Sequence, residues 1–145
     1  MNIMEQCRII EFGEFGDERG SLVVIEGEQK DIPFFIKRVF YMYGSDEKVI
    51  RGQHANRKTE FVLINVCGTS KVKVDNGFET EIIELNRPRM GLYIPTMMWK
   101  DMYDFSEDSV LLVLASENYD GSEYIRNYEE FKAEVKAHAV GSKDE

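Results

Sequence analysis

The sequence predicts an all-β protein, a β-sandwich or jelly roll, with one α-helix at its C-terminal end. Two observations predict this fold class. Short runs rich in β-branched and aromatic residues recur along the chain, with turn residues about every eight to twelve positions. A helical period appears once, where Tyr124, Tyr128, Phe131 and Val135 follow one another at spacings of four, three and four residues. We therefore expect the helix over about residues 122–138.

The strands expected before this helix follow from the same runs. Asp75-Asn76-Gly77 separates two of the runs and suits a tight turn, so these two should form a hairpin. The run 109–116 is continuously apolar, which predicts a central strand covered on both faces. Residues 13–20 and 51–60 are expected as loops, and 96–105 as an aromatic-acidic segment that favours a loop around Trp99. The expected strands are 7–12, 21–26, 34–43, 61–66, 71–74, 78–85, 90–95 and 109–116.

Composition limits the classes of partner. With 145 residues, 43% hydrophobic and 31% charged, the chain resembles one ordinary globular domain over 1–145 rather than a disordered segment. Its net charge of −9 argues against nucleic acid, because phosphate contacts need clustered lysine and arginine. No apolar run reaches the roughly 20 residues that span a membrane. Cys7 and Cys67 form no metal or redox pattern, so a reduced, cytoplasmic protein is expected.

The polar stretch from Arg51 to Glu60 is the best candidate for chemistry. It holds His54, one of two histidines in the chain, and leads directly into a strand. A histidine can act as a general base near neutral pH because its ordinary pKa is about 6.5. The alternative is a polar loop with one surface histidine.

The string from His54 to Glu60 also resembles the first metal motif of the cupins, H-x-H-x-x-x-E, with Asn56 in place of the second histidine. The later histidine of that pattern should lie near Trp99-Lys100, where none is present, and His138 falls in the helix. A borderline divalent metal needs about three or four good ligands. We therefore expect neither a metal ion nor another cofactor.

A set of further motifs carries a family resemblance over about residues 9–131. The motifs are Arg51-Gly52-x-His54-Ala55, Gly91-Leu92-Tyr93, Trp99, Asp104-Phe105, Val113-Leu114-Ala115-Ser116 and Tyr119-Asp120 followed by Tyr124-Ile125-Arg126-x-Tyr128. Together they resemble the metal-independent cupin 3,4-ketoisomerases of dTDP-4-keto-6-deoxyglucose, which are related to WxcM-like proteins. The resemblance implies a homodimeric jelly roll that binds a dTDP-sugar. It also implies an isomerase that moves a ketone from C4 to C3 through an enediol, in the biosynthesis of deoxysugars for surface glycans.

The resemblance also suggests site residues. The histidine pair of the family maps onto His54 and Asn56, and its Trp-His pair onto Trp99 and Lys100, so His54, Asn56 and Lys100 are the catalytic candidates. Asp17-x-Arg19-Gly20 resembles a substrate-binding motif of related dTDP-sugar epimerases. The candidates for substrate binding are Arg19, Arg38, Tyr43, Arg51, Glu60, Tyr93 and Trp99.

These candidates have different expected roles. The arginines suit a pyrophosphate, because a guanidinium presents a fork of donors, and the aromatic residues suit thymine or the sugar. A second proton carrier besides His54 would be Tyr41, Tyr43, Glu60 or Lys100. Three alternatives stay open: a related sugar-nucleotide epimerase, a non-catalytic dTDP-sugar-binding module, and a structural domain without a ligand.

Overall fold

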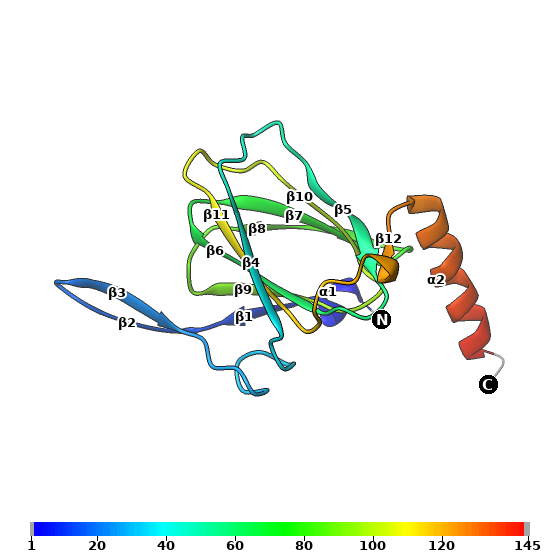
Figure 1. The fold of residues 1–145 in the computed structure, drawn as a ribbon, viewed down its shortest axis with the longest axis horizontal. Helices are drawn as coiled ribbons and strands as arrows, with labels where there is room; N and C mark the ends of the chain where they lie inside the picture. The colour runs from blue at the N-terminus through cyan, green and yellow to red at the C-terminus, as the bar shows by residue number, and fades with distance from the viewer. Residues whose placement is uncertain (1, 144–145) are drawn as a thin grey trace.

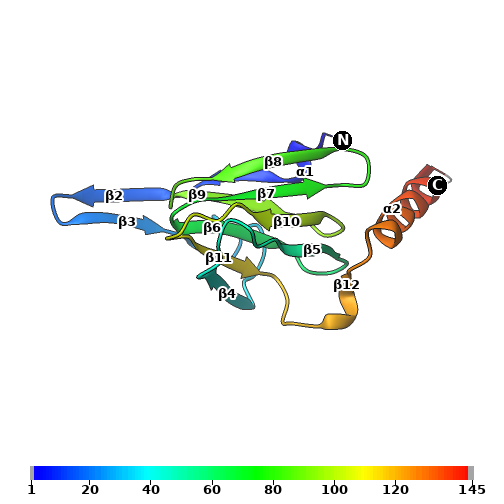
Figure 2. The same ribbon diagram turned by 90° about the horizontal axis from the view of Figure 1, so that it is seen from above.

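A computed structural model describes residues 2–143 and shows a β-sandwich with a hairpin projecting from one end and a helix at the other (Figures 1 and 2). The strands are β1 (Arg8–Glu11), β2 (Gly13–Asp17), β3 (Gly20–Val24), β4 (Arg38–Tyr43), β5 (Arg51–Asn56), β6 (Phe61–Cys67), β7 (Ser70–Asp75), β8 (Thr80–Leu85), β9 (Met90–Ile94), β10 (Trp99–Tyr103), β11 (Val110–Ala115) and β12 (Tyr124–Ile125). The helices are α1 (Ile3–Gln6), the 3-10 turn η1 (Gly121–Glu123) and α2 (Tyr128–Lys143).

Two antiparallel five-stranded sheets form the sandwich, in the orders β1-β9-β6-β11-β4 and β12-β5-β10-β7-β8. The predicted all-β jelly roll with a C-terminal helix is therefore confirmed. The hairpin expected at Asn76-Gly77 is also present, since β7 pairs with β8 and Gly77 adopts a positive φ of 93°. The predicted central strand is β11, which lies between β6 and β4. Among the residues that the structure describes, no helix is long and apolar enough to cross a membrane.

Alternation along each strand divides the apolar residues between the inside and the outside of the sandwich. Phe61 and Leu63 of β6 belong to the inner core, whereas Val62 and Ile64 belong to a second cluster on the outer face of the first sheet. Phe34 is part of this outer cluster, so the segment that precedes β4 covers this outer face. On the outer face of the second sheet, α2 packs through Phe131 against Ala55 and Trp99.

Three local expectations are corrected. Residues 13–20 are no loop, because β2 and β3 pair into a hairpin that extends away from the sandwich (Figure 1). Residues 51–56 and 99–103 are strands β5 and β10 of the second sheet. Their sequences looked like loops because one face of each strand carries polar side chains that point into the sandwich.

The terminal helix begins six residues later than the expected start at 122. Tyr124 and Ile125 form β12, which pairs with Asn56 and Ala55 of β5. Asn127 then caps the helix, and its side-chain oxygen accepts a hydrogen bond from the backbone N–H of Glu130 at 2.9 Å. The spacing of Tyr124 therefore matches the helical stripe by coincidence, and the helix itself starts at Tyr128.

We expect Phe131→Ala to destabilise the protein by about 3–5 kcal/mol, because it removes a large side chain with 0% exposure from the contact between α2 and the sheet. Urea unfolding would measure the loss. The exposed Lys136→Ala on the same helix is the control and should change the free energy of unfolding by less than about 0.5 kcal/mol. Equal losses for the two variants would contradict this packing.

Candidate functional site

A pocket of about 190 Å³ opens between the two sheets. It is lined by Phe40, Met42, Arg51, Gly52, His54, Phe61, Leu63, Lys100, Met102, Val113 and Tyr124. Most of these side chains are apolar, and the polar groups converge from β5 and β10. A more open hollow of about 650 Å³ lies elsewhere, but its charged residues are all acidic, so it does not suit an anionic ligand.

A β-bulge in β5 aims His54 into this pocket. Lys100 pairs with His54 and Asp101 with Gly52, so Gln53 is the extra residue. Gly52 and Gln53 both have positive φ, at 85° and 56°. A β-carbon on Gly52 would lie 2.8 Å from the carbonyl oxygen of Lys100, so only glycine allows the two strands to approach this closely.

His54 is arranged as a neutral base. Its Nδ1 lies 2.9 Å from the carbonyl oxygen of Gly52, and because a carbonyl can only accept, Nδ1 carries the proton and Nε2 carries the lone pair. Burial, together with the positive charge of Lys100, lowers the pKa of His54 to about 4. The ring also packs against Tyr124, with 4.7 Å between the ring centroids.

Lys100 supplies the second titratable group. Its side chain is 3% exposed, and its ammonium lies 4.7 Å from the centre of the Phe61 ring. Burial lowers the pKa of Lys100 to about 7, although the carboxylate of Glu123 acts in the opposite direction. Near neutral pH, the pocket thus holds a neutral imidazole beside an amine that can give or take a proton.

Asn56 is not among the residues that line the pocket. Both ends of its amide form hydrogen bonds with protein groups. Its Oδ1 accepts a hydrogen bond from Lys100 Nζ at 3.2 Å, and its Nδ2 donates to Glu123 Oε2 at 2.8 Å. The structure therefore places Asn56 behind Lys100, which argues against direct contact with a substrate.

Two arginines lie at or next to the pocket. Arg51 lines it and donates from Nε to Ser45 Oγ at 3.2 Å. Arg38 lies on the same face of β4 as the lining residue Phe40, and the Arg38 guanidinium is 5.3 Å from the Phe40 ring. The Nε and Nη2 atoms of Arg38 are buried and have no partner in the part of the chain that the structure describes. Such unpaired donors are suited to an anion.

Four of the expected substrate-binding residues lie outside the pocket: Tyr43, Glu60, Tyr93 and Trp99. Tyr43 is 70% exposed on the outward face of β4. Tyr93 is in the outer cluster, where its hydroxyl donates to Glu60 Oε1 at 2.6 Å. Trp99 packs on α2, 5.3 Å from the ring of Tyr128. Neighbouring residues of one strand face opposite sides, so Lys100 in the pocket requires Trp99 to point outward.

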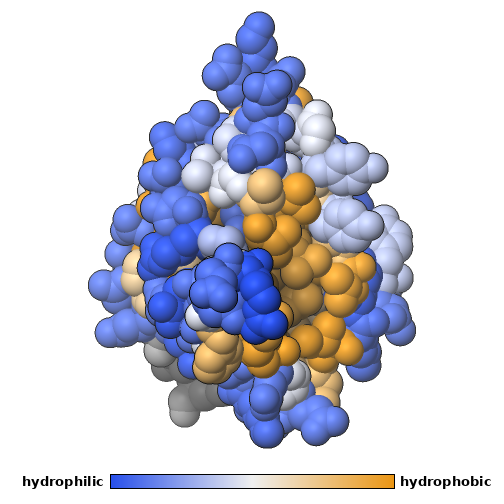
Figure 3. Space-filling model, turned by 90° about the vertical axis from the view of Figure 1, so that its left-hand side faces the viewer, coloured by the Kyte–Doolittle hydropathy of each residue, from blue (hydrophilic) through white to orange (hydrophobic). Residues whose placement is uncertain are grey.

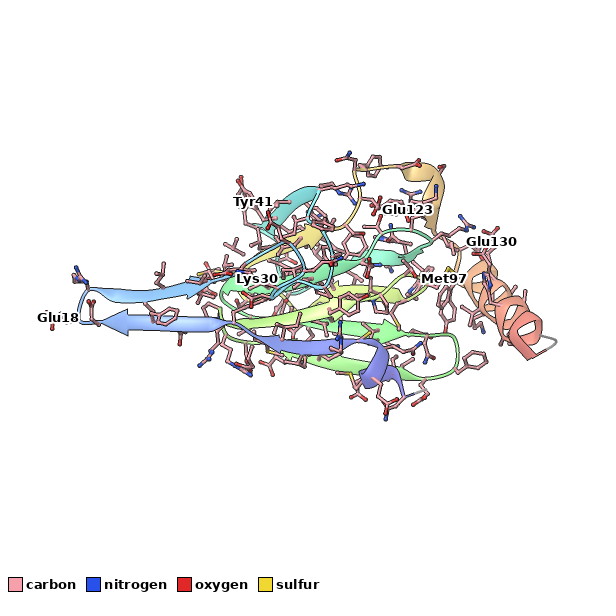
Figure 4. All side chains as sticks on the ribbon, turned by 90° about the horizontal axis from the view of Figure 1, so that it is seen from below. Glu18, Lys30, Tyr41, Met97, Glu123 and Glu130 are labelled. Carbon is pink, nitrogen blue, oxygen red and sulfur yellow. The ribbon has the colours of Figure 1, made fainter. Side chains whose placement is uncertain are left out.

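Arg19 is remote from the pocket of its own chain. It lies in the turn between β2 and β3 and forms an ion pair with Asp17 in which both side chains are exposed. Figure 4 shows its neighbour Glu18 at the end of the molecule opposite Glu123. The expectation that Arg19 sits at the mouth of the sheet in its own chain is therefore corrected.

Three residues of the site were not among the sequence candidates. Glu123 accepts a hydrogen bond from the Asn56 amide, the tilted ring of Tyr124 packs against His54, and the guanidinium of Arg126 lies 4.6 Å from the Tyr124 ring. The signal that could have found Tyr124 and Arg126 is the motif Tyr124-Ile125-Arg126, which carried part of the family resemblance but was assigned to the helix. No local pattern marks Glu123.

Metal ligands are not grouped in the part of the chain that the structure describes. It contains no cluster of three or more histidine, cysteine, aspartate or glutamate side chains that could hold an ion.

We expect the pKa of His54 to rise in Lys100→Met, because the variant removes a positive charge that disfavours the imidazolium. An NMR titration of the imidazole resonances would measure the change, starting from a value of about 4 in the native protein. Lys30→Met, on the outer segment, is the control and should leave the titration unchanged. A native His54 that titrates near 6.5 would contradict the geometry described above.

Comparison with known proteins finds relatives that match most of this chain. The chain is 46% identical over 125 residues to a TDP-4-oxo-6-deoxy-alpha-D-glucose-3,4-oxoisomerase from Aneurinibacillus thermoaerophilus, covering 86% of this chain and 89% of the relative. It superposes with a TM-score of 0.88 and 45% identity on the 3,4-ketoisomerase QdtA from Thermoanaerobacterium thermosaccharolyticum, covering 91% of this chain and 95% of that one. That structure is of a histidine-to-asparagine variant in complex with TDP-4-keto-6-deoxyglucose.

A more distant neighbour shares only the fold. It is a dTDP-4-dehydrorhamnose 3,5-epimerase from Bacillus anthracis, with a TM-score of 0.74 at 13% identity over 86% of this chain and 79% of that one. The family match itself is specific and extends over residues 5–136. The chain belongs to the WxcM-like, C-terminal family, FdtA.

Proposed function

We propose that the protein is a 3,4-ketoisomerase that acts on a TDP-linked 4-keto-6-deoxyhexose in deoxysugar biosynthesis. The observation that carries this proposal is the pair formed by His54 and Lys100 in one apolar pocket, a base with a free Nε2 beside a buried amine. The two relatives at 45–46% identity support the substrate class, since one is named as a TDP-4-oxo-6-deoxy-alpha-D-glucose-3,4-oxoisomerase and the other is a 3,4-ketoisomerase in complex with TDP-4-keto-6-deoxyglucose.

The reaction needs a base at C3 and an acid at the C4 oxygen. His54 Nε2 takes the proton from C3 while the C4 carbonyl oxygen receives a proton, and an enediol forms. The enediol then loses the proton of its C3 hydroxyl and gains one at C4, which leaves the ketone at C3. General acid–base help of this kind contributes about 10²–10⁴-fold to the rate.

Lys100 is the proposed acid. Of the four proton carriers considered from the sequence, Tyr41 and Tyr43 lie on the exposed face of β4, and Glu60 accepts a hydrogen bond outside the sandwich. Lys100 is the candidate that lines the pocket with His54. A pKa of about 7 lets it donate to the C4 oxygen and then recover a proton from the C3 hydroxyl.

The nucleotide would lie across the mouth of the pocket. A volume of about 190 Å³ is below the roughly 300–1,000 Å³ of clefts that enclose whole ligands, so the pocket suits the reacting sugar alone. Arg38 and Arg51 are the proposed contacts for the diphosphate, because Arg38 has unpaired buried donors and Arg51 is exposed at the pocket. On a protein of net charge −9, such a cationic rim favours an anionic ligand at this place.

Exchange of the substrate's C3 proton tests this proposal. With TDP-4-keto-6-deoxyglucose in D₂O, proton NMR should detect deuterium entering C3 with the native protein. In His54→Gln we expect exchange to fall by about 10²–10⁴-fold, because the base is removed. Affinity for TDP should stay within a few-fold.

Arg38→Ala is the complementary variant. It should weaken TDP binding about ten-fold or more, because a charge-assisted hydrogen bond contributes about 1.5–3 kcal/mol. Isothermal titration would measure the affinity. If the native protein binds TDP-4-keto-6-deoxyglucose and never exchanges its C3 proton, the protein is a binding module and the isomerase proposal fails.

We also propose that the protein forms a homodimer in the cytoplasm. Phe15 and Leu22 face each other across the hairpin β2–β3, and each is 62% exposed. Strand β4 is a sheet edge with exposed aromatic residues on its outer face. Figure 3, a view onto the hairpin end, shows hydrophobic residues gathered there. A second copy covering this surface would bring Arg19 of one protomer toward the other.

The proposed location in the cytoplasm rests on the cysteines. Both cysteines are free thiols, as expected in a reducing compartment.

We expect the native protein to have twice the mass of one chain in light scattering at micromolar concentration. The double variant Phe15→Glu, Leu22→Glu should shift the mass to that of one chain, because two buried interface carboxylates cost more than the contact provides. Phe78→Glu, at a 65% exposed position in the turn between β7 and β8, is the control and should remain dimeric, because this turn lies at the end of the sandwich opposite the hairpin (Figure 2). A native monomer would rule out the dimer.

A further inference from the structure

A buried chain of hydrogen bonds runs from Glu123 through Asn56 to Lys100, and only Lys100 of the three lines the pocket. We propose that Glu123 and Asn56 are positioning residues, which hold the Lys100 side chain as a directed ammonium for proton donation to the substrate. The catalytic half of this inference rests on the proposed function, whereas the state of Lys100 itself does not depend on it.

The geometry fixes each member of the chain. Asn56, Lys100 and Glu123 are 1%, 3% and 4% exposed. The Glu123 carboxylate accepts the backbone N–H groups of Lys58 at 2.8 Å and Thr59 at 3.2 Å, and also the Thr59 hydroxyl. Its Oε2 accepts from Asn56 Nδ2 at 2.8 Å, so Asn56 Oδ1 must face Lys100, which donates to it at 3.2 Å.

These hydrogen bonds keep Glu123 ionised although it is buried. Burial by itself would raise the pKa of Glu123, but the hydrogen bonds from Thr59, the Lys58 backbone and Asn56 outweigh it and hold the pKa below its usual value. A carboxylate with so many donors is a fixed negative charge at neutral pH.

Three titratable groups bear on Lys100. His54, on β5, is neutral at pH 7 because its pKa is about 4. Cys7, between α1 and β1, is also neutral, since burial raises the pKa of its thiol to about 12. Glu123 is then the charged group that favours the ammonium, against the burial that lowers the pKa of Lys100 to about 7.

An amide between the two charges has a specific consequence. A direct ion pair would turn the ammonium toward the carboxylate, whereas Asn56 lets Glu123 act on Lys100 while using only one N–H. Of the three N–H bonds of a lysine ammonium, one points to Asn56 and a second to the Met98 carbonyl at 3.5 Å. The third remains for an oxygen in the pocket.

The test is a titration of Lys100 by NMR in protein carrying ¹³C-labelled lysine, without substrate. We expect the Lys100 pKa to be lower in Glu123→Gln, which removes the charge, and in Asn56→Leu, which removes the bridge. In the double variant the fall in the pKa should be smaller than the sum of the two single falls, because the two residues belong to one hydrogen-bonded network. Asn56→Leu leaves the Lys58 and Thr59 bonds of Glu123 in place, so it tests the proposal even if Glu123→Gln does not fold.

Activity gives the second readout. Because Lys100 must be protonated to donate, kcat/KM for C3 exchange should fall as pH rises through its pKa, and this alkaline limb should move to lower pH in Glu123→Gln and Asn56→Leu. Glu134→Gln, which breaks the surface pair with Arg57, is the control and should leave the limb in place.

An unchanged Lys100 titration, or additive shifts in the double variant, overturns the positioning chain. A shifted titration in a protein that never exchanges the C3 proton instead refutes the proposed function and the catalytic half of this inference.

Discussion

The contact between Gly52 and the carbonyl of Lys100 is the constraint on which the site depends. It lets β5 bulge against β10, and the extra residue in the bulge sets which side chains of both strands face inward. His54 and Lys100 become neighbours across the strand pair for this reason. Any side chain at position 52 would push the strands apart and change both members of the acid–base pair at once.

Burial in the apolar pocket then gives His54 and Lys100 different protonation states at pH 7. Burial disfavours the charged form of His54 and of Lys100, so both pKa values move downward. Their ordinary values differ by about four units, and the shift leaves one group neutral and the other close to half-protonated at pH 7. One pocket thus holds two groups whose environments set their protonation states apart, a general way to divide the roles of base and acid.

Much of the fold followed from local sequence, and much of the site did not. The hairpin at Asn76-Gly77, the apolar strand β11 and the choice of His54 as a site candidate depend on short patterns that one stretch of chain contains. Which face a strand presents depends on register, and the bulge at Gly52 and Gln53 leaves no pattern that separates it from a loop. Trp99 and Lys100 were expected together in the site for that reason, although adjacent strand residues face opposite sides.

The role of Glu123 in the hydrogen-bond network could not be predicted from local sequence either, because its partners lie far away along the chain. Its bonds to Lys58 and Thr59 join residues 65 and 64 positions apart, so only the closed sandwich makes this carboxylate a buried anion. The chain then carries negative charge directly behind Lys100 and positive charge at the mouth, on Arg51 and Arg38. In the proposed reaction, an anionic ligand held by these arginines would add a second negative charge near Lys100 and so favour the ammonium while the ketone is bound. The proposed function would thus couple binding of the diphosphate to the protonation state that donation to the ketone oxygen requires.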